Sequence, residues 1–200
     1  MKQKSQKQTW DNIAPEWHKH KTRASTLAIE FLNKQKGNVL EIGAGSGRHL
    51  QQIKNGKMYI TDFSKEMIRL AKQKARKQKI SAECIVADMT KLPFEDNFFD
   101  AALSISSLHS IFQEQQEQAI KELYRVMKPK AQALIGVWNK ESKRFKRYRE
   151  QEKYIGWTDK GKRYYYLFRE DEIHNLFKKA GFKILEKKNS ELMIRFIVEK

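Results

Sequence analysis

The stretch of residues 39–47 places the strongest constraint on how this chain folds. It opens with Val39, Leu40 and Ile42, which are too few for a helix and belong to strand-forming types. Glycines follow at every second position, and glycine lets the backbone turn sharply and approach a ligand because it has no Cβ atom. We expect residues 48–53 to begin a helix whose exposed N–H groups face that ligand. Strand, turn and helix together predict the opening unit of a nucleotide-binding α/β sheet.

The position of the third glycine distinguishes between classes of nucleotide site. The dinucleotide fingerprint G-x-G-x-x-G would place it at position 48, which is Arg48, whereas the chain has Gly47. The pattern follows an acidic residue and resembles motif I of the class I S-adenosylmethionine (SAM)-dependent methyltransferases. The resemblance implies that the loop binds the methyl donor through Glu41, Gly43, Ala44, Gly45 and Gly47. A glycine-rich turn with a purely structural role is the alternative, and the downstream residues decide between the two.

Residues 58–62 form the second predicted strand, which ends in an acidic residue. Asp62 lies about 20 residues past the start of the first strand, where a carboxylate accepts hydrogen bonds from ribose hydroxyls. Phe63 and Met67 follow at the start of a helix, and this region resembles the segment after motif I in the methyltransferases. We predict that these three side chains line the cofactor site.

The third strand, at residues 82–86, is followed by Asp88 and Met89. The methyltransferase resemblance implies that this acid hydrogen-bonds the adenine amino group and that the neighbouring side chain packs on the adenine ring. An ordinary core position is the alternative for Met89. Residues 101–105 supply the fourth strand, so five landmarks stand in the order of one fold. Together they predict SAM as the cofactor.

The acceptor chemistry is expected at the end of the fourth strand, where Ser104 and His109 lie. We predict that Ser104 borders the cofactor and that His109 orients the acceptor or acts as a base, with a structural histidine as the alternative. The sequence has no Asn/Asp-Pro-Pro-aromatic motif of the kind that methylates exocyclic amines, and its single cysteine, Cys84, lies inside a predicted strand. A nucleophile that is already adequate, such as a carboxylate oxygen or a ring nitrogen, therefore fits best.

The charge balance points to a polyanionic partner. The chain has 41 Lys and Arg against 24 Asp and Glu, a net charge of +17, which favours RNA or DNA; a solvated lysine-rich surface is the alternative. A single cysteine fits a reducing cytoplasm and excludes a cysteine-based zinc site, and we expect no bound metal. No apolar run reaches the roughly 18 residues of a membrane span, and no secretory signal is evident. We expect a cytoplasmic protein without membrane contact.

We expect one domain over residues 1–200 with two additions, the first of which is the N-terminal segment 1–36. Residues 1–8 are predicted to be a frayed basic tail, and the two nearby tryptophans suggest that the next residues dock on the domain. In methyltransferases a segment before motif I often forms a lid over cofactor and acceptor, and Arg23 would lie on or beside it. A solvent-facing basic stretch is the alternative.

The second addition is the insert at residues 140–169, which holds eleven Lys or Arg against four acids. Eight aromatic residues are interleaved with these cations. Proteins that recognise single-stranded RNA typically bind its phosphates with cationic side chains and stack aromatic rings on its bases. Some of the aromatics must anchor the loop to the core, but the composition predicts contact with nucleic acid.

The remaining segments complete the predicted fold. Helices are expected at residues 114–127 and 170–180, and strands at 131–138, 182–186 and 192–198, the last two as a hairpin. The expected architecture is an α/β, Rossmann-like, seven-stranded class I methyltransferase sheet with helices on both faces.

Several segments support a narrower resemblance. The chain resembles the tRNA wobble-uridine carboxymethyl methyltransferases in Trp10–Pro15, Thr22–Arg23, Ile120–Val126, Ala133–Trp138 and Arg163–Phe168. That family esterifies the carboxylate of 5-carboxymethyluridine in the tRNA anticodon loop, and a small zinc-ribbon partner often activates its members. The resemblance implies that Arg23 lies beside the acceptor pocket and clamps a carboxylate or phosphate. The family has adjacent histidines after the fourth strand, where this chain has His109 and Ser110.

Three functions follow from these patterns. The first is methyl esterification of tRNA at the wobble uridine. The second is methylation of oxygen or nitrogen in a small molecule, because the same SAM-binding core serves both. The third is a SAM-binding protein without catalysis, and the cofactor landmarks argue against it.

Overall fold

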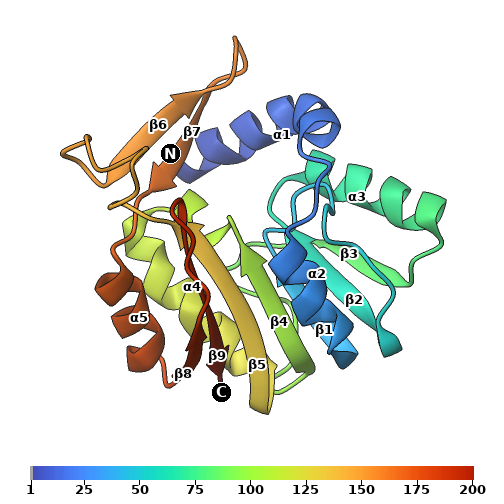
Figure 1. Cartoon of the computed structure of the whole chain (residues 1–200). Coiled ribbons are helices and arrows are strands. Elements are labelled where there is room, and N and C mark those ends of the chain that lie inside the picture. The colour runs from blue at the N-terminus through green and yellow to red at the C-terminus, as the bar shows by residue number, and fades with distance from the viewer. Residues whose placement is uncertain (1) are drawn as a thin grey trace.

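The computed structural model describes residues 2–200, with side chains from residue 6 onward. A seven-stranded sheet in the order β3-β2-β1-β4-β5-β9-β8 carries the fold (Figure 1). The strands are β1 (Lys36–Ile42), β2 (Lys54–Asp62), β3 (Ala82–Val86), β4 (Phe99–Ile105), β5 (Met127–Trp138), β8 (Lys183–Lys187) and β9 (Met193–Glu199). The five strands β1 to β5 run parallel to one another, and β9 is antiparallel to its two neighbours, β5 and β8. The predicted sheet and its C-terminal hairpin are confirmed.

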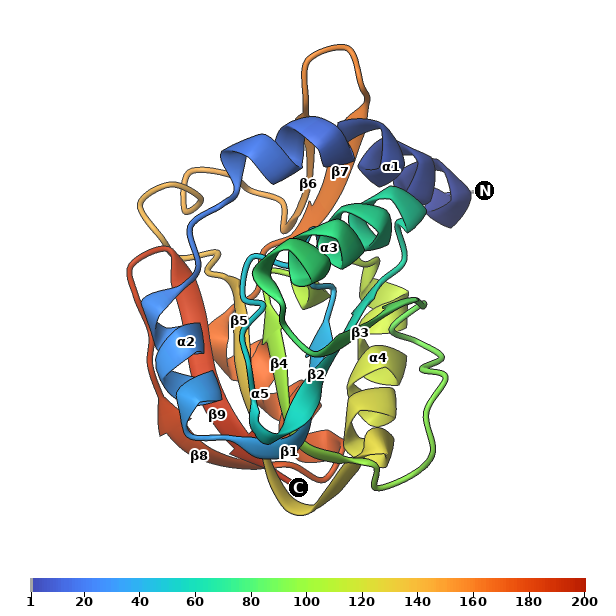
Figure 2. The ribbon, with the colours of Figure 1, turned by 90° about the vertical axis from the view of Figure 1, so that its right-hand side faces the viewer.

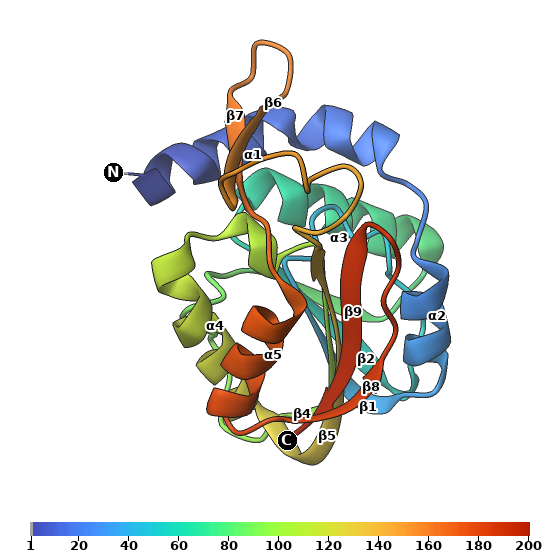
Figure 3. The same ribbon diagram turned by 60° about the vertical axis from the view of Figure 1, so that its left-hand side comes forward.

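Helices cover both faces of this sheet, as expected (Figure 3). Apolar residues of α2 (Thr26–Asn33) and α3 (Lys65–Gln78) pack on one face. Those of α4 (Gln113–Val126) and α5 (Glu170–Lys179) pack on the other. The central strands β1, β4 and β5 are largely buried on both faces by these helices, so ligands can reach them at the carboxyl ends of the parallel strands, where they bind in such sheets.

The helix predicted after the glycine turn is wrong. Residues 43–49 form turns, and residues 50–53 are an irregular segment that leads into β2. Leu50 and Ile53 are buried against the sheet, and Gly47 has a φ of +75°, outside the range of a right-handed helix, with space beside it for no Cβ atom because the Leu50 side chain would lie 2.6 Å away. The motif I loop is therefore held by packing rather than by a helix of its own.

The predicted frayed tail is also wrong for the described part of residues 1–8, because α1 (Lys2–His20) is one helix that continues through Pro15. Met1 lies outside the described residues. Trp10, Ile13 and Ala14 are buried against α3 and the insert. Burial of this apolar face, rather than helix propensity, stabilises α1.

Hydrogen bonds fix α1 between two distant parts of the chain (Figure 2). Asp11 accepts hydrogen bonds from the Ser64 hydroxyl (2.6 Å) and the Glu66 N–H (3.1 Å) at the start of α3. On the other side, Gln6 accepts from the Tyr164 N–H (2.8 Å), and Glu16 accepts from the Trp157 indole (2.5 Å). The last two partners belong to the insert, whose hairpin consists of β6 (Glu152–Gly156), β7 (Lys162–Tyr166) and the turn between them. The expected lid is thus a docked helix that bridges α3 and the hairpin.

Candidate functional site

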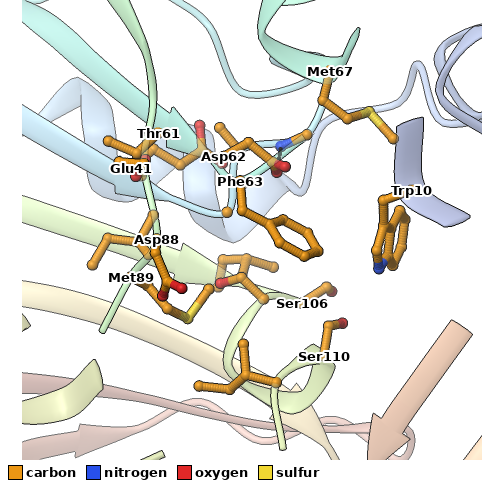
Figure 4. A pocket seen from close by; sticks show the side chains of 18 of the residues that line it. Trp10, Glu41, Thr61, Asp62, Phe63, Met67, Asp88, Met89, Ser106 and Ser110 are labelled. Atoms are coloured by element: carbon orange, nitrogen blue, oxygen red, sulfur yellow. Dashed lines mark hydrogen bonds between the residues drawn. The ribbon is translucent and has the colours of Figure 1, made fainter. Parts of the chain in front are cut away.

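A pocket of about 990 Å³, open solvent included, lies at the carboxyl ends of β1, β2 and β4. Residues of α1, among them Trp10 at the right of Figure 4, close one side of it, and the segment after β4 forms its floor. Its lining joins the glycine turn to the residues that follow β2, β3 and β4, which is where ligands bind in open α/β sheets.

Nine of the eleven predicted cofactor residues line this pocket. They are Glu41, Gly43, Ala44, Gly45, Asp62, Phe63, Met67, Asp88 and Met89. Gly47 and Ser104 do not line it, so the structure gives these two predictions no support. Gly47 packs against Leu50 and Ala71 behind the loop, and the buried Ser104 hydroxyl bonds the Ser107 hydroxyl at 2.7 Å.

Asp62 organises the side of the pocket that faces β2. Its carboxylate accepts one N–H from Gly45 in the glycine turn and one from Ser64 at the start of α3, both at 2.9 Å. The side chain is buried, which raises its pKa to about 6, and the nearby carboxylates of Asp11 and Glu41 act in the same direction. The two N–H groups favour the ionised form and fix the carboxylate toward the pocket.

Glu41 provides a second test of whether SAM fits. One of its carboxylate oxygens lies 2.6 Å from Nδ1 of the buried His49. The other oxygen is buried without a hydrogen-bond partner among the described residues, although the side chain lines the pocket. Leaving a buried carboxylate oxygen without a hydrogen bond costs folding free energy. The ammonium group of SAM is a hydrogen-bond donor of opposite charge that could pair with this oxygen. The residues present therefore fit SAM.

The pKa of Asp62 leads to a prediction for ligand binding. The predicted hydrogen bonds from ribose hydroxyls require the ionised carboxylate, so the affinity for S-adenosylhomocysteine should be full above about pH 6 and fall as the pH drops below that value, by up to tenfold per unit. Isothermal titration calorimetry between about pH 5 and pH 7 measures this dependence. An Asp62→Asn variant should bind more weakly at every pH and lose the dependence, whereas the same slope in wild type and variant would contradict this assignment.

The acceptor side of the pocket combines α1 with the segment after β4. Trp10, Trp17 and Lys21 contribute from α1 and the residue just past its end, and Ser106 and Ser110 face them from below. The two indole rings meet edge to face, with centroids 5.1 Å apart. The sequence gives only an indirect signal for these residues, because the paired tryptophans suggest a docked segment without showing which surface it covers.

Arg23 does not lie where the resemblance would place it. Its side chain is exposed and is outside the pocket lining, because α1 ends at His20 and the chain then turns toward α2. The cationic residues that line the pocket are Lys21 and Arg48.

His109 is buried beneath the pocket and does not line it. Its Nδ1 accepts the Trp138 N–H at 2.9 Å, and its ring packs against Trp138 and Tyr165. Burial, with the nearby positive charge of Arg48, lowers its pKa to about 3. The imidazole is therefore neutral at physiological pH and holds its proton on Nε2, so it is a donor and does not fit the predicted role of a base. The structural alternative is favoured.

Most aromatic residues of the insert are buried, whereas most of its cationic residues are exposed. Five of its eight aromatics are buried, namely Phe145, Tyr164, Tyr165, Tyr166 and Phe168. Tyr154, which is 50% exposed, is the aromatic residue most open to solvent. Most of the cations remain exposed, including Lys143, Arg144, Lys146, Arg147, Arg149, Lys162 and Arg169. The aromatics thus mainly anchor the insert, and the prediction that they stack on bases is wrong for the buried five.

Trp157, in the turn of the insert hairpin, packs against Trp17 with ring centroids 5.5 Å apart. Arg163, from β7, lies within 5.8 Å of the rings of Trp10, Trp17 and Trp157 and donates to the Tyr165 hydroxyl at 2.7 Å. The insert therefore supports the pocket wall directly. Within residues 2–200 no helix is long and apolar enough to cross a membrane.

Comparisons with known proteins agree with the methyltransferase fold. The model of a methyltransferase domain family matches residues 40–135. The probable tRNA methyltransferase 9B of Mus musculus is 30% identical over 152 residues, covering 74% of this chain and 32% of the relative. The tRNA (carboxymethyluridine(34)-5-O)-methyltransferase of Schizosaccharomyces pombe is 27% identical over 209 residues, covering 90% of this chain and 89% of the relative. The chain thus spans about a third of the length of the mouse protein but most of the length of the yeast one.

Solved structures share the fold. A SAM-dependent methyltransferase from Methanosarcina mazei superimposes with a TM-score of 0.74 at 24% identity, covering 89% of this chain and 98% of that one. A complex from Haloferax volcanii that contains the Trm112 methyltransferase activator matches with a TM-score of 0.68 at 16% identity, covering 95% and 96%. At these identities the likeness establishes the architecture alone.

Proposed function

Because this chain belongs to the class I SAM-dependent methyltransferases, we propose that it methylates tRNA, esterifying the carboxylate of 5-carboxymethyluridine at the anticodon wobble position. The observation that carries the proposal is a SAM-type pocket whose acceptor side is walled by α1 and supported by the cationic insert. The likeness to the yeast tRNA enzyme along most of both chains supports the choice of acceptor.

When bound, SAM supplies a methyl group on a sulfonium, which is a good leaving group. Glu41, Asp62 and Asp88 would hold its ammonium and nucleoside parts, and Trp10 and Trp17 would exclude water from the acceptor side. A carboxylate nucleophile is already ionised at neutral pH, so the chain has to position it rather than deprotonate it. This requirement agrees with a neutral, buried His109 that is not a base.

The tRNA would be held through its phosphates. Exposed cations of the insert lie beside the α1 wall, and α3 presents a second basic face with Lys65, Arg69, Lys72, Arg76, Lys77 and Lys79 exposed. Such surfaces bind nucleic acid without reading its sequence. We also propose a cytoplasmic location and a small zinc-ribbon activator, of the kind present in the Haloferax volcanii complex, as a partner.

The test is transfer of labelled methyl groups from SAM, with and without a zinc-ribbon activator. Acceptors are tRNA that carries 5-carboxymethyluridine, the same tRNA from cells that do not install the carboxymethyl group, and a panel of small carboxylic acids and amines. We expect label only in the first. Label in the small molecules without RNA would establish a small-molecule methyltransferase instead, and any turnover excludes a non-catalytic protein.

A further inference from the structure

Arg48 is a pocket cation without an acidic partner. Its side chain, half-buried in the motif I loop, lines the pocket. No carboxylate forms an ion pair with it among the described residues, whereas Arg69, Arg125 and Arg169 each pair with an acid. The nearby Glu41 bonds His49 instead. A guanidinium withdrawn from water gains most from a bound anion, and its planar set of donors matches a carboxylate.

Two serine hydroxyls complete this anion site. Ser106 Oγ lies 3.4 Å from a terminal nitrogen of Arg48. Ser106 has a φ of +64°, a left-handed backbone conformation that is uncommon for serine. Such strained backbone conformations persist where the surrounding structure enforces them, and they cluster at functional sites. Ser110 also lines the pocket, and its hydroxyl is buried without a hydrogen-bond partner among the described residues. In Figure 4 both side chains project from the floor on the side of Trp10, away from Asp88 and Met89.

We propose that Arg48, Ser106 and Ser110 form a carboxylate-binding site that positions the acceptor for methylation. The inference rests on the proposed carboxylate acceptor and assigns to Arg48 the clamping role that the sequence resemblance gave to Arg23. Ser110 stands where the resembled family has a second histidine, so this chain supplies a hydroxyl donor at that place.

The charges of the reaction explain why such a clamp would release its product. A carboxylate oxygen forms a bond to the methyl carbon, the carbon–sulfur bond breaks, and its electron pair stays on sulfur. The negative carboxylate and the positive sulfonium become a neutral ester and a neutral thioether, and no proton moves. Arg48 thus attracts the substrate and not the ester. Because the carboxylate loses charge toward the transition state, removing the clamp should raise KM more than it lowers kcat.

The experiment measures binding to two anticodon stem-loops that differ in one group. Fluorescence anisotropy in the presence of S-adenosylhomocysteine compares a stem-loop with 5-carboxymethyluridine and one with its neutral amide, 5-carbamoylmethyluridine. Wild-type protein should prefer the carboxylate by about tenfold to 100-fold. Arg48→Gln should abolish the preference, Ser110→Ala should reduce it, and Arg48→Lys should restore part of it. Arg23→Gln, a change of the same type at an exposed position outside the pocket, should leave the preference unchanged.

A second measurement separates the acceptor carboxylate from the carboxylate of SAM itself. Calorimetry should give Arg48→Gln the wild-type affinity for S-adenosylhomocysteine. A large loss there would assign Arg48 to the methyl donor and overturn the proposal, as would an unchanged preference between the stem-loops. If wild-type protein methylates the tRNA while Arg48→Gln keeps the preference, only this inference fails. If wild-type protein neither methylates the tRNA nor prefers the carboxylate, the proposed function fails with it.

Discussion

Replacing Asp62 with asparagine should lower the affinity for S-adenosylhomocysteine by about 100-fold and abolish measurable methyl transfer. Each oxygen of the Asp62 carboxylate accepts one backbone N–H, from Gly45 or from Ser64. In asparagine one of these oxygens becomes an NH₂ group, which is itself a donor and cannot accept that N–H. The binding free energy should fall by about 3 kcal/mol, because the glycine turn is displaced and a charge-assisted hydrogen bond to the ligand is lost. Isothermal titration calorimetry gives the affinity directly.

The control for this change is Asp171→Asn, which removes an exposed carboxylate in the first turn of α5, outside the pocket. It should leave the affinity within about twofold of wild type. An Asp62→Asn protein that keeps its fold, judged by circular dichroism, and binds as tightly as wild type would remove Asp62 from the donor site.

Neutralising three exposed cations of the insert should weaken tRNA binding by at least about tenfold. The variant is Lys143→Gln, Lys146→Gln and Arg149→Gln, all at exposed positions, so the fold should be kept. Each lost phosphate contact removes roughly 0.7 to 0.9 from the slope of log affinity against log salt, so the slope should fall by about 2. Filter binding across a salt series measures both quantities.

A matched triple variant separates local contacts from net charge. Three exposed lysines begin strands β1, β2 and β8, at the end of the sheet opposite the pocket. They are Lys36, Lys54 and Lys183. Their change to glutamine removes the same charge and should shift affinity by less than about threefold. Equal losses in both variants would show that overall charge, rather than the insert, attracts the tRNA.

The parts of the fold that could be predicted from the sequence are those set by local pattern. The strands of the sheet and the start of α3 follow from runs of a few residues, and α3 begins at Lys65, between the predicted Phe63 and Met67. α1 could not be predicted in this way. Its bonds join Asp11 to Ser64 and Gln6 to Tyr164, residues that are 53 and 158 positions apart. Contacts at such separations leave no periodic signal in the sequence.

The insert shows the same limit for the site. Its composition reveals many aromatics but not the direction that each one faces. Tyr164 packs on Phe112 and Tyr165 on Trp10, so both faces of β7 are covered and no alternation of buried and exposed residues remains. The strand is sandwiched between α1 and the segment after β4, which only the tertiary structure brings together.

The role of Arg23 was assigned by resemblance, and that of His109 by its position after the fourth strand, which does not show the direction that the side chain faces. The structure places Arg23 outside the pocket and gives Nδ1 of His109 a backbone donor. The glycine turn and the acids that follow β2 and β3 do line one pocket, and the sequence could indicate this because the carboxyl ends of parallel strands converge at one end of the sheet. Residues of the acceptor side depend on how α1 closes that edge.

The most direct test of the central claim is mass spectrometry of nucleosides from tRNA incubated with SAM and this protein. The account predicts that 5-carboxymethyluridine decreases and that its methyl ester appears in equal amount. Mild alkali should return the ester to the free acid, which distinguishes it from methylation at nitrogen or carbon. The Asp62→Asn protein should give no ester. Unchanged 5-carboxymethyluridine in the presence of active, SAM-binding protein and a zinc-ribbon activator, or a methyl group that resists alkali, would contradict the account.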